Sequence, residues 1–135
     1  MAKIVLNNPV ITFGAVDLTG FISSVALDTK LDIIETTAFG STAKTRVAGL
    51  ADNSISLEFM QDYAAASVEA TIYPLIGTAV SIVMKPVNAA TSTTNPQYTV
   101  TAIVSEWSPL KGGIGALATV SVSWPVSGAI AKVTA

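Results

Sequence analysis

The sequence contains no cysteine and no histidine among its 135 residues. Without cysteine there is no disulfide framework, no thiolate metal site and no cysteine nucleophile. Without histidine, the commonest metal ligand and the usual general base at neutral pH are also missing. The spacing of Ser41 and Lys44 matches the Ser-x-x-Lys of penicillin-binding enzymes, but the Lys-Thr-Gly and Ser-Asp-Asn motifs that accompany it there are absent. We therefore expect no catalytic residues, no cofactor and no bound metal ion.

Charge is also scarce. Only 12% of the residues are charged, whereas an average globular domain has about 25%. Seven basic and nine acidic residues give a net charge of −2, which argues against binding nucleic acid by neutralising its phosphates. A folded monomer of this mass exposes roughly 6,600 Å², so each charge would serve about 400 Å² of surface. Either Ser and Thr cover much of that surface, or much of it is buried against other chains.

One uncharged run of twenty residues, 112–131, is long enough to raise the question of a membrane span. It contains four Gly and a Pro, and from Ala118 onward apolar residues alternate with Ser and Thr. A period of two predicts a half-buried strand rather than a membrane helix, so we expect no membrane association. The first nine residues have no sustained apolar stretch, which predicts that the chain has no signal peptide and is used in the cytoplasm.

Short alternating segments rich in Val, Ile, Thr and Ser predict a mainly β protein, an antiparallel β-sandwich or barrel with one flanking α-helix, folded as one domain over residues 1–135. Short additional strands are expected at residues 4–6 and 130–133. A turn is expected at Thr29-Lys30, between the first two strands. Six strands are predicted, over residues 22–28, 31–37, 54–60, 80–85, 98–107 and 117–126.

The predicted helix covers residues 64–76, about three turns. Asp62 is placed to cap its start and Gly77 to end it in a left-handed conformation. Pro74 predicts a distorted last turn, because it lacks a backbone N–H. The apolar side chains that recur at helical spacing and would pack on a sheet are Val68, Ile72, Leu75 and Ile76.

Two further features bear on function. Residues 38–53 are predicted to form a sixteen-residue loop, and loops of that length are usually functional or disordered. Asp28, Asp32 and Glu35 fall in one predicted hairpin; such carboxylates can act in catalysis or hold a divalent ion, but a solvated or lumen-facing acidic strip is the favoured interpretation. Trp107 and Trp124 fall in predicted strands and are expected in a core or interface.

The pieces Thr37-Ala38-Phe39-Gly40, Arg46, Gly49-Leu50-Ala51-Asp52 and the alternating strand at 54–62 occur in this order within residues 35–62. The stretch resembles the major tail tube proteins of long-tailed, siphovirus-type bacteriophages. In those proteins a strand ends in a Thr-x-Phe-Gly-like segment, a long loop carries a basic residue, and Gly-Leu-x-Asp precedes a strand that ends in Asp. The resemblance continues through VEATIYPLIGTAV and SIVMKP, and more loosely to Trp124-Pro125, over about 90 of the 135 residues.

The resemblance implies a structural virion protein that assembles in the host cytoplasm into hexameric rings, which stack as a tail tube. The inner strands of six subunits would form a continuous barrel through which double-stranded DNA passes without specific binding, and the protein would contact other phage tail or head proteins. The residues carried over to the loop between rings are Phe39, Gly40, Arg46, Gly49 and Leu50. The acids Asp28, Asp32 and Glu35 would then be candidates for the lumen, where negative charge repels phosphate.

Two alternatives remain open from the sequence. A capsid decoration protein that binds the head shell is a similar small β-domain, but such proteins more often have an extended terminal arm than a long internal loop. A module that binds a glycan or a surface protein would favour exposed aromatic residues on loops, whereas Trp107 and Trp124 are predicted in strands.

Overall fold

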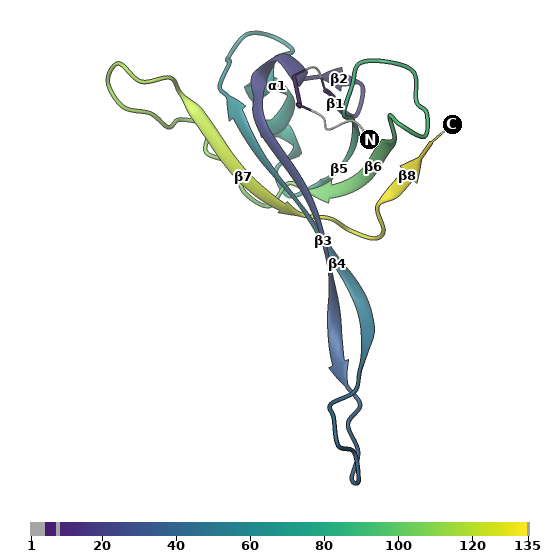
Figure 1. Ribbon diagram of the computed structural model, residues 1–135. Coiled ribbons are helices and arrows are strands. Elements are labelled where there is room, and N and C mark those ends of the chain that lie inside the picture. Colours follow the sequence, from purple (N-terminus) through teal and green to yellow (C-terminus); the bar gives the residue numbers. More distant parts are fainter. Residues whose placement is uncertain (1–4, 8, 135) are drawn as a thin grey trace.

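Two antiparallel sheets form the head of the molecule, and a long hairpin extends from it (Figure 1). The computed structural model describes residues 5–7 and 9–134. The five-stranded sheet has the order β2-β1-β5-β6-β8, and its strands are β1 (Val10–Phe13), β2 (Val16–Asp17), β5 (Ala79–Lys85), β6 (Gln97–Ile103) and β8 (Ala131–Val133). The three-stranded sheet has the order β3-β4-β7, and its strands are β3 (Ile22–Glu35), β4 (Arg46–Met60) and β7 (Thr119–Pro125). The predicted fold class, mainly β with antiparallel sheets and one flanking α-helix, is confirmed.

The core lies between the two sheets, where alternation along each strand buries one face. Ile55, Leu57 and Phe59 of β4 are buried as predicted. The Phe59 ring lies 6.2 Å from that of Trp124 and 5.4 Å from that of Trp107, centroid to centroid. Aromatic rings at these separations add to the stability gained from burial. This aromatic cluster therefore stabilises the packing of the head on the side of β4 and β7.

The predicted turn at Thr29-Lys30 is wrong. β3 is one continuous strand of fourteen residues, and it pairs along its whole length with the fifteen-residue β4. The Thr29-Lys30 pair contains no Gly, Asn or Pro to reverse the chain, and the alternation that begins at Val25 continues to Ile33. The connection between the two strands is also shorter than the predicted loop, because residues 46–53 belong to β4 and only residues 36–45 connect.

The helix is shorter than predicted, α1 (Val68–Ile72) followed by the 3-10 turn η2 (Tyr73–Leu75). Ala66 has a φ of 58°, which is incompatible with a right-handed helix that starts at residue 64. Pro74 lies in the 3-10 turn, and Gly77 has the expected left-handed φ of 83°. The side chains of Val68 and Ile72 are buried as expected, whereas Ile76 is exposed.

Several smaller differences concern strand limits. The sequence did not predict β1 and β2 or the 3-10 turn η1 (Thr19–Phe21), and β6 ends at Ile103 instead of Trp107. In the predicted strand at 4–6, residue 4 lies outside the described residues, and residues 5 and 6 are not in a strand. The C-terminal strand is present as β8. No helix within the described ranges has the length and apolarity needed to cross a membrane.

Candidate assembly surface

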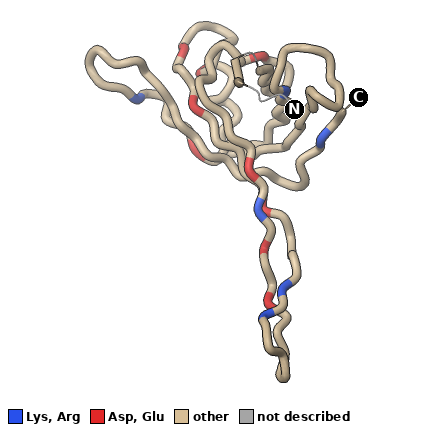
Figure 2. Tube along the Cα trace, viewed as in Figure 1, with Lys and Arg blue, Asp and Glu red and all other residues tan. Residues whose placement is uncertain are grey.

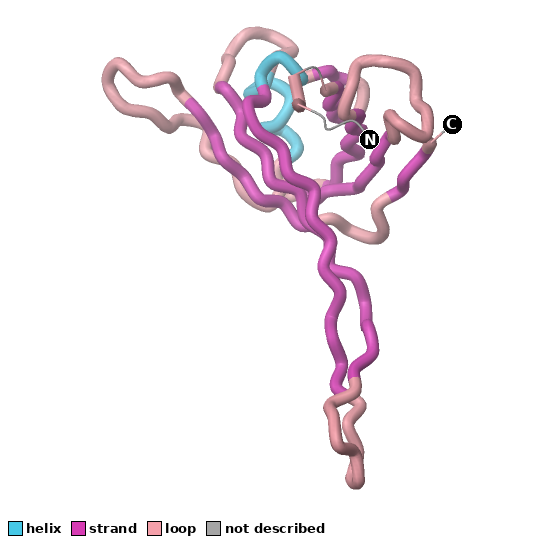
Figure 3. The backbone as a smooth tube through the Cα atoms, viewed as in Figure 1, coloured by secondary structure: helices cyan, strands magenta, loops and turns pink. Residues whose placement is uncertain are grey.

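The most prominent feature of the molecule is the outer part of the β3-β4 hairpin, residues 28–53, which we call the arm (Figures 1 and 3). β7 pairs with β4 only from Met60 to Ser54. Beyond Ser54, the partner of β4 is β3 alone. At about 3.3 Å per residue, the strand from Asp28 to Glu35 extends roughly 25 Å from the head. The arm is therefore a two-stranded ribbon that the head does not cover.

Asn53 fixes the point where the arm leaves the head. Its side chain is only 4% exposed. The Asn53 Nδ2 group donates a hydrogen bond to the carbonyl of Gly128 at 2.9 Å, and the Thr29 hydroxyl bonds to its Oδ1. The Asn53 carbonyl also accepts a bond from the N–H of Val126 at 2.9 Å. These bonds join both strands of the arm to the segment that follows β7, so the direction of the arm is set by the head.

A β-bulge interrupts the arm halfway along its length. The pairing shifts by one residue between Leu31 and Ile33, so that two residues of β4, Gly49 and Leu50, lie opposite Asp32. A Cβ atom on Gly49 would lie 3.2 Å from Ile34 Cδ1 and 3.3 Å from the Asp32 carbonyl oxygen. Glycine thus allows the two strands to approach closely at the bulge.

The tip of the arm is a tight turn that exposes an aromatic ring. The N–H of Ser41 donates to the carbonyl of Ala38 at 3.2 Å, and Gly40 at the third position has a φ of 86°, as a type II turn requires. Phe39, at the second position, is fully exposed (109%). The turn therefore holds a large apolar side chain at the far end of the molecule.

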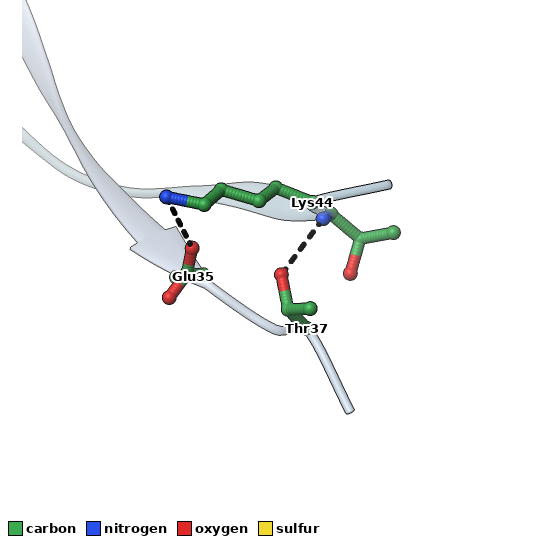
Figure 4. A network of polar contacts seen from close by, with 4 residues as sticks. Glu35, Thr37 and Lys44 are labelled. Carbon is green, nitrogen blue, oxygen red and sulfur yellow. Dashed lines mark hydrogen bonds and ion pairs between the residues drawn. The ribbon is translucent and has the colours of Figure 1, made fainter. Parts of the chain in front are cut away.

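Polar bonds close the hairpin just above this turn. The Thr36 N–H donates to the Thr45 carbonyl at 2.8 Å, and the Thr45 N–H donates to Thr37 Oγ1 at 3.0 Å. Figure 4 shows Lys44 reaching across to Glu35, with Nζ 3.8 Å from Oε1. This ion pair is exposed, so it contributes little to stability.

The large apolar side chains of the arm are all at least half exposed in the subunit. Leu50 is 83% exposed. The whole chain exposes 8566 Å², about 2,000 Å² more than a monomer of this mass is expected to expose. The arm side chains concerned are Leu31, Ile33, Ile34, Phe39, Val47 and Leu50.

Charges of both signs run along the arm (Figure 2). By alternation along β3, the side chains of Asp28, Lys30 and Asp32 share one face, and Asp52 lies opposite Lys30 in the register. Glu35 is on the other face, opposite Arg46 and paired with Lys44. The predicted acidic set is thus divided: Asp28 and Asp32 share a face that also carries Lys30, and Glu35 lies among cations.

A second exposed apolar segment lies at the other end of the three-stranded sheet. We call residues 109–117, within the connection from β6 to β7, the apical loop; in Figure 1 it is the yellow-green loop at the upper left. Its base is held by the Pro109 carbonyl, which accepts bonds from Tyr63 Oη at 2.5 Å and Gln61 Nε2 at 3.0 Å. Beyond that base, three large side chains are exposed: Leu110, Ile114 and Leu117.

An apolar groove of about 650 Å³ opens beside the base of the arm, between the two sheets. Val25 and Leu27 line it from β3, and Met84 and Tyr98 line it from the five-stranded sheet. Because these lining residues are largely apolar, the groove suits apolar side chains.

Within residues 5–7 and 9–134, no three acidic side chains converge where they could hold a metal ion.

The structure brings the loop residues taken from the resemblance together on the arm, but not in one loop. Phe39 and Gly40 lie in the tip turn, whereas Arg46, Gly49 and Leu50 lie in β4. Trp124 is fully buried, and Trp107, outside any strand, packs against the core and donates from Nε1 to Glu69 Oε1 at 2.9 Å. Sequence reasoning missed the roles of Asn53 and of the apical loop; for the loop, an apolar Ile114 between two glycines was the available signal.

No family model matches the sequence, and no curated protein matches it. The fold does occur in solved structures. A chain from the virion of a native gene transfer agent particle superposes with a TM-score of 0.75 at 11% identity, with 97% of this chain and 99% of that chain covered. A chain from the sheath/tube terminator of an extracellular contractile injection system, in its extended state, gives a TM-score of 0.74 at 15% identity, with 98% and 97% covered.

A third similar chain comes from the six-fold symmetrised baseplate of the anti-feeding prophage, with a TM-score of 0.60, 11% identity and coverage of 98% and 97%. The match extends over nearly the whole of both chains in all three cases. At these identities the likeness establishes a shared fold.

Proposed function

We propose that this protein is a structural subunit of a phage-like tail, and that its copies assemble into stacked rings that form a tube for the passage of DNA. The observation that carries the proposal is the arm, an apolar two-stranded ribbon anchored at its base and uncovered along its length. The shared fold with chains of a gene transfer agent virion, a contractile injection system and an anti-feeding prophage baseplate supports a tail role. The narrower identity, a siphovirus-type major tail tube protein, rests on the sequence resemblance.

The arm supports self-assembly because it is a poor structure for an isolated subunit. A lone two-stranded hairpin is marginally stable in water, and Leu50 and Phe39 add exposed apolar surface. The excess of about 2,000 Å² over an ordinary monomer is more than the roughly 800 Å² that each partner contributes to a standard protein-protein interface. A neighbouring copy that covers the arm would bury this excess.

Ring formation is supported by the open sheet edges. β3 is an edge strand along all fourteen residues, and β7 is the other edge of its sheet. Exposed edges promote pairing with further strands, and closing a ring of subunits removes them. We take six copies as the ring number from the resemblance and from the six-fold baseplate that shares the fold.

The acids of the arm give the tube a lumen suited to DNA. Asp28 and Asp32 would face the channel, and Lys30 of the same face lies opposite Asp52, a residue of opposite charge. A surface of net negative charge repels phosphate, so DNA slides without being held. Arg46 forms no ion pair within the described residues and is available to a carboxylate of a neighbouring copy.

The arm also separates this function from capsid decoration. The extended element here is an internal hairpin, whereas clasping of a shell is more often the task of a chain terminus. Capsid decoration is the alternative function that would be favoured if the protein forms no tube.

Negative-stain electron microscopy of the purified protein at rising concentration, with light scattering, tests the proposal. Stacked rings or tubes with a central channel are expected, and Arg46→Ala is expected to weaken stacking. Only monomers or trimers at every concentration, also after addition of a tail-tip complex as initiator, would refute the tube and favour decoration.

A further inference from the structure

We propose that the apical loop, residues 109–117, is the surface of the next copy in the stack on which the arm docks. The inference rests on the proposed function and adds the receptor to it. The contact between copies is then heterologous, because the arm of one subunit contacts the apical loop of the next and the two partners use different surfaces.

The first argument is position. β4 and β7 pair from Ser54 opposite Pro125 to Met60 opposite Thr119. The arm continues from the first of these ends and the apical loop from the second, so the two apolar surfaces lie at opposite ends of one sheet (Figure 1). Surfaces at opposite ends of a molecule meet when copies repeat head to tail, and such heterologous contacts build open stacks.

The second argument is chemistry. Ile114 is fully exposed (109%), and Leu110 and Leu117 accompany it. Lys111 carries the single charge within the loop, so the loop offers a mainly apolar surface to the apolar side chains of the arm. At roughly 100 Å² for each buried side chain, the six exposed apolar side chains of the arm and the three of the loop amount to about 900 Å², close to the ~1,000 Å² of a specific interface; the arm side chains nearer the tip would be buried against the flank of the next head.

The third argument is preorganisation on both sides. The base of the loop is held at Pro109 by Tyr63 and Gln61, and the base of the arm is held by Asn53. Each surface is therefore fixed at its base, which lowers the entropy lost when the two bind.

Length decides which part of the arm meets the loop. The sheet from Ser54 to Met60 is about 23 Å long, and the strands of the arm are about 25 Å long. With heads stacked end to end, the arm would run along the next head. Its near part, around Leu31 and Leu50, would lie beside the apical loop, and Phe39 would reach the flank beyond.

The absence of cysteine allows a direct test. Leu50→Cys and Ile114→Cys are introduced together, assembly is followed by electron microscopy, and a bismaleimide linker of about 8 Å is added. Within one subunit the two positions lie beyond opposite ends of a 23 Å sheet, so the linker cannot join them there. A ladder of linked dimers, trimers and longer chains is expected. Each single variant should stop at a dimer or below, and mixed single variants should give the 50-to-114 product.

The matched control replaces Leu50→Cys by Thr93→Cys, an exposed position on the loop before β6, and should give no ladder. Ile114→Asp should raise the critical concentration for assembly at least tenfold while leaving the unfolding midpoint unchanged. Tubes that form without the 50-to-114 product, or with 50-to-50 links alone, would overturn the docking site and leave the proposed function standing. Failure of the wild-type protein to assemble, also after addition of the tail-tip complex, would overturn both.

Discussion

Replacing Phe39 with alanine separates the role of the arm in assembly from the stability of the subunit. Phe39 is fully exposed at the tip turn, and the turn itself is closed by the backbone bond from Ser41 to Ala38. Substitutions on a surface without special contacts change the free energy of unfolding by less than about 0.5 kcal/mol. The isolated Phe39→Ala subunit should therefore unfold at the same denaturant concentration as the wild type.

The expected effect appears on assembly. If a neighbouring copy buries the ring, the side chain contributes about 1.5–3 kcal/mol to the contact. Since 1.4 kcal/mol corresponds to a factor of ten in an equilibrium constant, the critical concentration should rise about 10- to 150-fold. Because every subunit in a ring makes the contact, the loss is repeated in each copy.

The assay is the concentration of protein that remains in the supernatant after assembly and sedimentation. Tyr73→Ala provides a matched control, because it removes another exposed aromatic ring, from the 3-10 turn η2 on the head. A change of less than threefold for Phe39→Ala, with an unchanged unfolding midpoint, would refute the burial of the tip.

Three further predictions concern the base, the bulge and the strands of the arm. Asn53→Ala should lower the free energy of unfolding by about 1–3 kcal/mol in urea titrations, because it removes the two hydrogen bonds that the buried Asn53 side chain makes with Thr29 and with the Gly128 carbonyl; a loss under 0.5 kcal/mol would contradict the anchoring role. Gly49→Val should impair assembly without shifting the unfolding midpoint, because its side chain would displace the facing strand of the arm; normal tubes would contradict it. Backbone amides of residues 28–35 and 46–53 should exchange hydrogen faster than those of β5 in the free subunit and become protected in the tube; protection in the free subunit would contradict the marginal stability of the arm.

The sequence predicted the core better than the arm, and the reason is physical. Ile55, Leu57 and Phe59 alternate because one face of their strand is buried, and burial constrains residue type at every second position. In the arm, residues 46–52 include no buried side chain and show no alternation. Their strand conformation comes from pairing with β3, a contact between residues that are distant in the chain.

The long β3 strand did carry a local signal. Val25, Leu27, Leu31 and Ile33 keep the period of two through Thr29-Lys30, where the sequence analysis expected a turn. The polar Thr29 and the charged Lys30 were interpreted as a boundary between two strands. Neither residue favours the backbone conformation that a turn requires.

The remaining parts of the candidate surface had weaker signals. Nothing next to Asn53 in the sequence shows that its side chain reaches Gly128, 75 residues away. The exposure of the apical loop follows from its place beyond the end of the sheet, which the sequence alone does not reveal. The resemblance drew attention to Phe39, Gly40, Arg46, Gly49 and Leu50, and the structure places all five on the arm.

A cryo-EM reconstruction of the assembled protein tests the central claim most directly, because it locates the arm of each subunit. The expected reconstruction shows stacked rings in which every arm crosses to the adjacent ring and its apolar side chains are covered by another copy. Rings or tubes in which the arms remain solvent-exposed, or fold back on their own subunit, would contradict it.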